Sequence, residues 1–242
     1  MGKVFKWFIS VLVILLVVLV PLTILMVKFD YQSGMGTAVR NILIKYPKIV
    51  ELINLNQPGD YRYYYKNLDN PIEIFVAHTD GNVVNDNLKN WLTSMVDATL
   101  KQPTMVTVDP NPLPFGKNSV SLTDLNTMRI EAISRSGKNT NLYIIYTSSY
   151  MPQPSIAGIV AHRDTIFIFK QNLESLVSQP QQLNDIEQST IMHEWGHLLG
   201  LEHNDLPNCL MSATSDIEIN RLNNRNFFPT TYCWDEVYEL LR

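Results

Sequence analysis

Cysteine, excess positive charge and repeated segments are scarce or missing in this chain of 242 residues. It contains two cysteines, no internal repeat, no low-complexity tract and no Asn-x-Ser/Thr glycosylation site. Lysine and arginine together number 19 against 23 aspartates and glutamates, which gives a net charge of -4. Because nucleic-acid binding requires a basic surface, this balance excludes nucleic acid as an expected partner.

One long hydrophobic run lies near the amino end. The stretch from Trp7 to Val27 carries no charge, and a helix of that length spans about 30 Å, the thickness of a bilayer core. A cleaved secretory signal has a shorter apolar region and a small-residue cleavage site, which only residues 33–36 weakly match. We therefore predict a transmembrane anchor over residues 7–27, with a cleaved signal as the alternative.

The charges around this run predict its orientation. Lys3 and Lys6 precede it, and a short tail with two lysines crosses a membrane poorly, so residues 1–6 are expected in the cytoplasm. The remainder then lies outside the cytoplasm in a single-pass protein of the cell membrane. We interpret residues 28–70 as a stalk with an amphipathic segment and residues 71–242 as one exported domain, large enough for a single core.

The sequence HEWGHLLGLEH at 193–203 contains the strongest functional signal. Residues four apart lie on one face of a helix, so His193 and His197 can bind one ion. His203 can reach the same ion if the helix ends at Gly200, since glycine tolerates the left-handed conformation. Three neutral imidazoles leave a fourth position open, which is typical of a catalytic zinc ion, Zn²⁺. The alternative is a helix with ordinary surface histidines.

Glu194 lies beside these ligands in the sequence, and its carboxylate indicates the type of reaction. Zinc lowers the pKa of a bound water toward about 7 and polarises a carbonyl. Glu194 would accept the proton of that water and pass it to the departing amine. The ligand set therefore predicts peptide hydrolysis without an acyl-enzyme.

This motif resembles that of the metzincin clan of zinc metallopeptidases, which continues to a methionine-bearing turn. NCLMSAT follows at 208–214, and the resemblance makes Met211 the Met-turn residue that packs beneath the metal. It also implies an α+β domain with a mixed twisted sheet, in which residues 157–162 form the edge strand that pairs with substrate. The family within the clan stays open, because Asn204 and Ala213 fit none of the usual patterns and the extra cysteine cluster of archaemetzincins is missing.

The two cysteines flank the end of the expected catalytic domain. Cys209 adjoins the Met-turn and Cys233 lies near the carboxyl end. Exported domains commonly pair such residues, and this pairing would tie the Met-turn to the terminal helix. Two buried free thiols are the alternative. Neither cysteine precedes the catalytic helix, so no prodomain cysteine can mask the zinc.

Hydrophobic periodicity predicts the remaining elements. We expect Asn184 or Asp185 to cap the start of the catalytic helix, and a hairpin to turn at Arg163 and Asp164. The aromatic stretch within 56–71 is read as a turn, a strand or arm, and a second turn. His78 and His162 lack metal-ligand spacing and are expected to be structural. Further strands are expected at 72–78, 104–109 and 141–150, and helices at 86–100, 122–135 and 234–242. The last of these helices is expected to bury four side chains, those of Trp234, Val237, Tyr238 and Leu241.

The sequence thus predicts a membrane-anchored zinc endopeptidase that acts on protein or peptide substrates. A non-catalytic module could use the same cleft to hold a peptide or partner, although such a role does not require Glu194. Zinc-dependent hydrolysis of a non-peptide bond in the cell envelope is a third interpretation. No oligomeric state is assigned.

Overall fold

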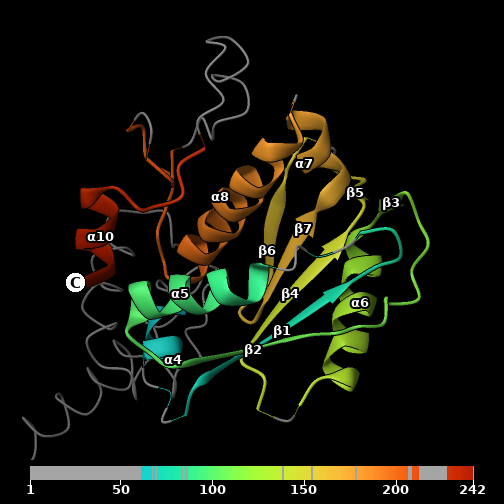
Figure 1. Ribbon diagram of the computed structural model, residues 1–242, viewed down its shortest axis with the longest axis horizontal. Helices are drawn as coiled ribbons and strands as arrows, with labels where there is room; N and C mark the ends of the chain where they lie inside the picture. Colours follow the sequence, from blue (N-terminus) through green and yellow to red (C-terminus); the bar gives the residue numbers. More distant parts are fainter. Residues whose placement is uncertain are drawn as a thin grey trace, which may run out of the picture. The chain divides into compact units, whose positions relative to one another are not determined.

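Figure 1 shows the computed structural model of the chain, which describes residues 61–66, 68, 70–82, 84, 87–137, 139–153, 155–177, 179–206, 209–212 and 228–241. These residues belong to one compact unit that runs from Pro58 to Arg242. The predicted tail and anchor, together with residues 28–60 of the predicted stalk, lie outside the described residues. Within the described ranges, no helix has the length and apolar character that a membrane crossing requires.

A five-stranded mixed sheet forms the centre of the unit (Figure 1). Its order is β2-β1-β4-β7-β6, with the first four strands parallel and β6 antiparallel to β7. The expected hairpin at Arg163 and Asp164 is confirmed, and β6 lies at one edge. The strands are β1 (Ile72–His78), β2 (Thr104–Val108), β4 (Leu142–Thr147), β6 (Gly158–His162) and β7 (Thr165–Phe169), beside a small parallel pair, β3 (Ser119–Val120) and β5 (Ser149–Tyr150).

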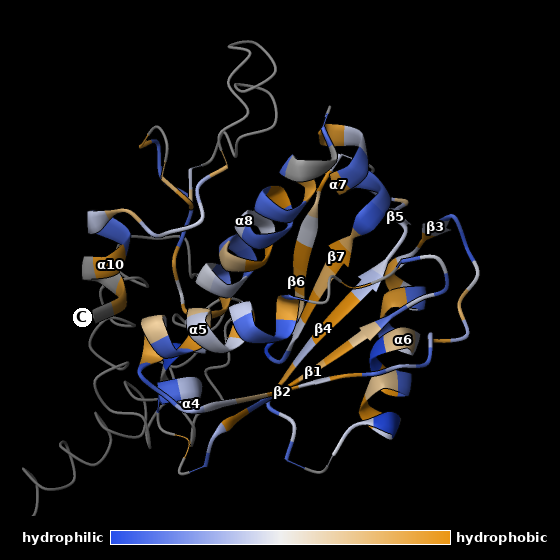
Figure 2. Cartoon of the chain, in the orientation of Figure 1, coloured by the Kyte–Doolittle hydropathy of each residue, from blue (hydrophilic) through white to orange (hydrophobic). Residues whose placement is uncertain are grey.

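Helices cover both faces of this sheet. Helices α5 (Leu88–Leu100) and α8 (Pro180–Leu198) share one hydrophobic core with it, and α6 (Leu122–Arg135) forms a second core on the other face. Every residue of β4 and β7 is buried, and Figure 2 shows the apolar character of these central strands. Strands buried on both faces need continuous apolar runs, which is why LYIIYT and TIFIF form the middle of the sheet.

Helix α8 begins earlier than the sequence analysis predicted. It starts at Pro180 with Gln179 as its N-cap, so the predicted cap at Asn184 or Asp185 is wrong. Proline suits the first turn of a helix because its fixed φ is already helical and its missing N–H has no intrahelical partner there. The short helix α7 (Lys170–Leu176) precedes it.

The aromatic stretch forms helix α4 (Arg62–Lys66), so the predicted strand or arm is wrong. The Tyr61 N–H donates to the Leu198 carbonyl at 2.8 Å, and Arg62 Nε donates to the Leu199 carbonyl at 2.8 Å. The last carbonyls of a helix have no partner within it. This segment therefore caps the carboxyl end of α8, where the catalytic histidines were expected.

The buried face of the terminal helix α10 (Trp234–Leu241) also differs from the prediction. Trp234 is 75% exposed and Val237 is 39% exposed, whereas Glu236 and Leu240 are buried. The expected apolar face was therefore wrong for Trp234 and Val237. Glu236 faces inward because it accepts hydrogen bonds from the nearby Cys233 N–H and from two residues distant in the sequence, Met211 and Asn204.

Candidate active site

Helix α8 and the turn after it bring three histidines together. His193 and His197 lie one turn apart on α8, which ends at Leu198. Gly200 follows with φ of 81°, in the left-handed region, and the chain then returns toward the helix. As a result, the Nε2 atoms of His193, His197 and His203 lie 3.1, 3.1 and 3.2 Å from one another.

This spacing fits one tetrahedral metal ion. Ligand nitrogens about 2.0–2.1 Å from zinc lie about 3.3 Å apart at tetrahedral angles. The three Nε2 atoms come within a few tenths of an ångström of that separation, and His203 is exposed, which leaves one side of the triad accessible. The triad is therefore compatible with a single zinc ion that keeps an open position.

The surroundings of two histidines favour the metal-binding form of imidazole. Leu210 O accepts from His193 Nδ1 at 2.8 Å, and Leu201 O accepts from His197 Nδ1 at 3.0 Å. With the proton on Nδ1, the Nε2 lone pair points toward the common centre. Burial and the neighbouring His197 lower the pKa of His193 to about 4, and burial lowers the pKa of His197. Both rings are thus neutral at pH 7, as metal binding requires.

Glu194 lies between α8 and the edge strand β6 and is not part of the triad. Its side chain is nearly inaccessible, with the residue 7% exposed. Burial raises the pKa of Glu194 to about 8, and a hydrogen bond from the Val160 N–H acts in the opposite direction. A cation on the adjoining histidines favours the ionised carboxylate. Glu194 is therefore a buried carboxyl group close to two of the three histidines in the sequence, with a pKa above its ordinary value.

Gly158 is a site residue that the sequence analysis did not single out. A Cβ atom at this position would lie 2.8 Å from Thr190 Cγ2 and 2.9 Å from Glu194 Cγ. Glycine thus lets β6 approach the catalytic helix closely enough to contact Glu194. Glycine within a strand pattern often marks such a close approach, and this signal could have identified it.

Met211 packs directly beneath the histidine-bearing turn of α8. It is fully buried, and a Cβ at Gly196 would lie 2.5 Å from its Sδ atom and 3.2 Å from Tyr232 Cε1. Gly196 lies between the two helical histidines in the sequence, so the methionine occupies the space that a larger residue would fill. Met211 therefore packs against the helix turn that carries His193 and His197, and its role as a Met-turn residue stays a prediction.

Cys209 and Cys233 form a disulfide, with Cα atoms 5.3 Å apart. The bridge ties the Met-turn to the start of α10, as predicted. Beside it, the buried carboxylate of Glu236 accepts from the Met211 N–H, the Cys233 N–H and Asn204 Nδ2 at 2.7, 2.9 and 2.8 Å. Glu236 was missed, because two of its three partners, Met211 and Asn204, are distant in the sequence.

Comparison with known proteins points to the same chemistry. A family model for zincin-like metallopeptidases matches residues 119–210, from β3 through the histidine motif to the residue before Met211. No curated protein matches the chain. Together the family match and the triad indicate a zinc peptidase.

Solved structures resemble the fold. Archaemetzincin from Methanopyrus kandleri is 17% identical, with a TM-score of 0.54 over 71% of this chain and 94% of its own. A zinc-dependent peptidase from Methanocorpusculum labreanum is 15% identical, with a TM-score of 0.48 over 70% of this chain and 99% of its own. The first likeness supports an α+β zincin-like fold. It concerns the fold alone, and the cysteine cluster that set archaemetzincins apart in the sequence analysis is still missing here.

Proposed function

We propose that this chain is a metzincin-type zinc endopeptidase, anchored by residues 7–27 with its catalytic domain outside the cytoplasm. The observation that carries the proposal is the buried Glu194 carboxylate, held beside three convergent imidazoles and against an open edge strand. A binding module would need neither the carboxylate nor an accessible position at the triad.

Each residue of the site has a definite part in the proposed reaction. His193, His197 and His203 would hold zinc, which supplies Lewis-acid polarisation of a carbonyl and a more acidic water. Glu194 takes the proton of the attacking water and delivers it to the leaving amine. Burial of Glu194 keeps this proton from exchanging freely with solvent, and Met211 and Gly196 hold the helix turn from below.

The edge strand β6 supports a peptide as the substrate. It pairs on one side with β7, and its other side has no strand partner in the described part of the sheet. An extended peptide can add to such an edge through main-chain hydrogen bonds. Gly158 and Val160 both contact Glu194, so a peptide paired with β6 would bring its backbone to the catalytic carboxylate.

Two features support the proposed location. The uncharged run at 7–27 is long enough for a membrane span. The disulfide between Cys209 and Cys233 suits an oxidising compartment outside the cytoplasm. Protease added to intact cells should then digest the carboxyl-terminal domain, and complete protection would favour the opposite topology.

The function is tested with the purified full-length chain, mixed unfolded proteins and the Glu194→Gln variant. Wild type should contain close to one zinc per chain and cut peptides, and a strong chelator should abolish cleavage. Glu194→Gln should retain zinc and thermal stability but lose on the order of a hundredfold to ten-thousandfold in rate. His203→Ala should lose zinc, whereas His78→Gln serves as a control that keeps it. Peptide binding without any cleavage by zinc-loaded wild type would favour the non-catalytic module.

A further inference from the structure

A cavity of about 300 Å³ lies at the end of the edge strand β6. Tyr61, Arg129, Val160, Ala161, His162 and Arg163 line it. Val160 lines this cavity and also contacts the candidate active site, because its backbone N–H donates to Glu194. The cavity therefore adjoins the active site along β6, the strand that would bind substrate.

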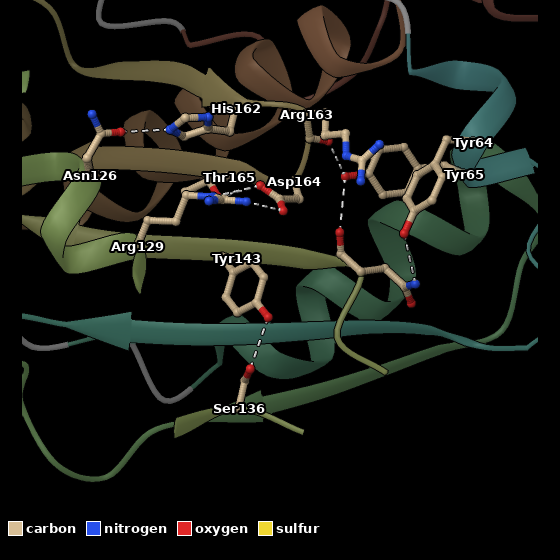
Figure 3. A network of polar contacts seen from close by, with 11 residues as sticks. Tyr64, Tyr65, Asn126, Arg129, Ser136, Tyr143, His162, Arg163, Asp164 and Thr165 are labelled. Atoms are coloured by element: carbon tan, nitrogen blue, oxygen red, sulfur yellow. Dashed lines mark hydrogen bonds and ion pairs between the residues drawn. The ribbon is translucent and has the colours of Figure 1, made fainter. Parts of the chain in front are cut away.

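A β-bulge shapes this end of the strand. The pairing of β6 with β7 shifts register between Val160 and His162, and a bulge re-aims the side chains next to it. His162 consequently points toward α6, where its Nε2 atom lies 2.8 Å from Asn126 Oδ1 (Figure 3). An amide oxygen only accepts, so His162 Nε2 donates here and the ring is held in place.

Most of the charge around the cavity is already paired. Arg129 Nε and Nη2 donate to the two carboxylate oxygens of Asp164 at 3.0 and 2.6 Å (Figure 3). This bidentate pair cancels the charge of both residues. Burial lowers the pKa of His162, with Arg129 acting in the same direction and Asp164 in the opposite one, so that imidazole is neutral at pH 7.

Arg163 is the cation that remains. None of the ion pairs found among the described residues includes it, and its side chain is exposed. Its backbone carbonyl accepts from the Tyr65 hydroxyl at 2.9 Å, and its guanidinium lies 5.9 Å from the Tyr64 ring centre (Figure 3). A guanidinium against an aromatic ring keeps a preferred orientation without losing its charge.

We infer that this cavity is a substrate subsite for an acidic side chain, with Arg163 as the specificity-determining residue. The inference rests on the proposed peptidase function. Arg163 lies in the turn one residue beyond β6 and three positions after Val160, and strands rise about 3.3 Å per residue, so the acidic side chain should lie about three substrate residues from the bond that is cut, on one side only. Arginine binds carboxylates through two parallel hydrogen bonds, which suits the side chain of aspartate or glutamate.

The test is a set of otherwise neutral peptides in which one glutamate or glutamine occupies each position around one cleavable bond. The full-length, zinc-loaded chain should cut the glutamate peptide about fivefold to tenfold faster in kcat/KM at one position, about three residues from the bond and on one side only. The difference should appear in KM, because the contact binds substrate without changing during the reaction. Arg163→Gln should bring the ratio close to one, and Arg163→Glu should favour lysine at that position.

Arg135→Gln is the matched control, since Arg135 is an arginine of α6 paired with Glu131 and Asp109 and does not line the cavity. It should leave the glutamate-to-glutamine ratio at the wild-type value. An unchanged ratio in Arg163→Gln would overturn the subsite while leaving the peptidase intact. If no peptide is cut, binding of the same pairs to Glu194→Gln decides the matter. Equal affinities for the glutamate and glutamine peptides would then refute the subsite, and failure of cleavage alone would refute only the proposed function.

Discussion

The carboxylate of Glu236 accepts a hydrogen bond from the backbone N–H of Met211 at 2.7 Å. The same side chain also accepts from Asn204, the residue after the third histidine, and from the Cys233 N–H. Glu236 is only 3% exposed. One buried carboxylate therefore holds together the Met-turn, the His203 segment and the start of α10.

Glu236→Gln should destabilise this junction. An amide offers one acceptor oxygen, so its NH₂ group would face a backbone N–H that has lost its partner. We expect a loss of about 2 to 3 kcal/mol in the free energy of unfolding, and weaker zinc binding by about tenfold to a hundredfold, as found for groups that orient metal ligands. Urea unfolding and zinc competition measure the two effects.

Asp235→Asn provides the control for this prediction, because Asp235 is the exposed neighbour on the same helix. It should change neither stability nor zinc binding appreciably. Wild-type zinc affinity in Glu236→Gln, in protein that is measurably less stable, would mean that Glu236 supports the fold and does not position the site.

Gly196→Ala tests the packing of Met211 under the catalytic helix. Replacing a helical glycine by alanine ordinarily stabilises by about 1 kcal/mol, but here the new Cβ would lie 2.5 Å from Met211 Sδ. Overpacking of a buried site costs about 1 to 3 kcal/mol. We therefore expect net destabilisation and reduced zinc retention, measured by thermal unfolding and metal analysis. Gly116→Ala, which has open space around the new Cβ, should show neither effect, and a more stable Gly196→Ala with full zinc content would disprove this packing.

The disulfide should be present in protein recovered from its native membrane. Thiol labelling without reductant should find no free cysteine, and two reactive thiols would count against both the bridge and the extracytoplasmic placement. The double replacement Cys209→Ala/Cys233→Ala should lower the free energy of unfolding by roughly 3 kcal/mol, as the chain-entropy model gives for a loop of this length.

The start of α6 should respond to acid. Ser121 and Asp124 form a capping box, and hydrogen bonds from Lys117 and Ser121 lower the pKa of Asp124 to about 2. Because the folded-state pKa lies below the ordinary value of 3.8, the stabilisation is fully present above about pH 5 and is lost as the pH falls toward 2. Urea unfolding should show wild type more stable than Asp124→Asn at pH 6, with the difference shrinking below pH 4. A difference that does not change with pH would contradict this account.

The sequence by itself determined the features that depend on local spacing. His193 and His197 are four residues apart, which places them on one helix face whatever surrounds the helix, and Gly200 supplies the left-handed turn that brings His203 back. Alternating and continuous apolar runs likewise fixed β1, β4 and β7, and the polar pair Arg163 and Asp164 marked the hairpin. In each case the physical cause lies within a few residues of its effect.

Tertiary structure alone decided which distant groups meet. Tyr61 caps α8 across more than a hundred positions of sequence, Gly158 lies against Glu194, and Glu236 turns inward on a helix whose apolar Trp234 is exposed. A carboxylate is buried at Glu236 because Met211 and Asn204 donate to it together with the nearby Cys233 N–H, and no pattern within α10 encodes the two distant donors. Hydrogen-bond partners that come from separate segments depend on the assembled fold, so periodicity could place the zinc ligands but not the contacts that hold them.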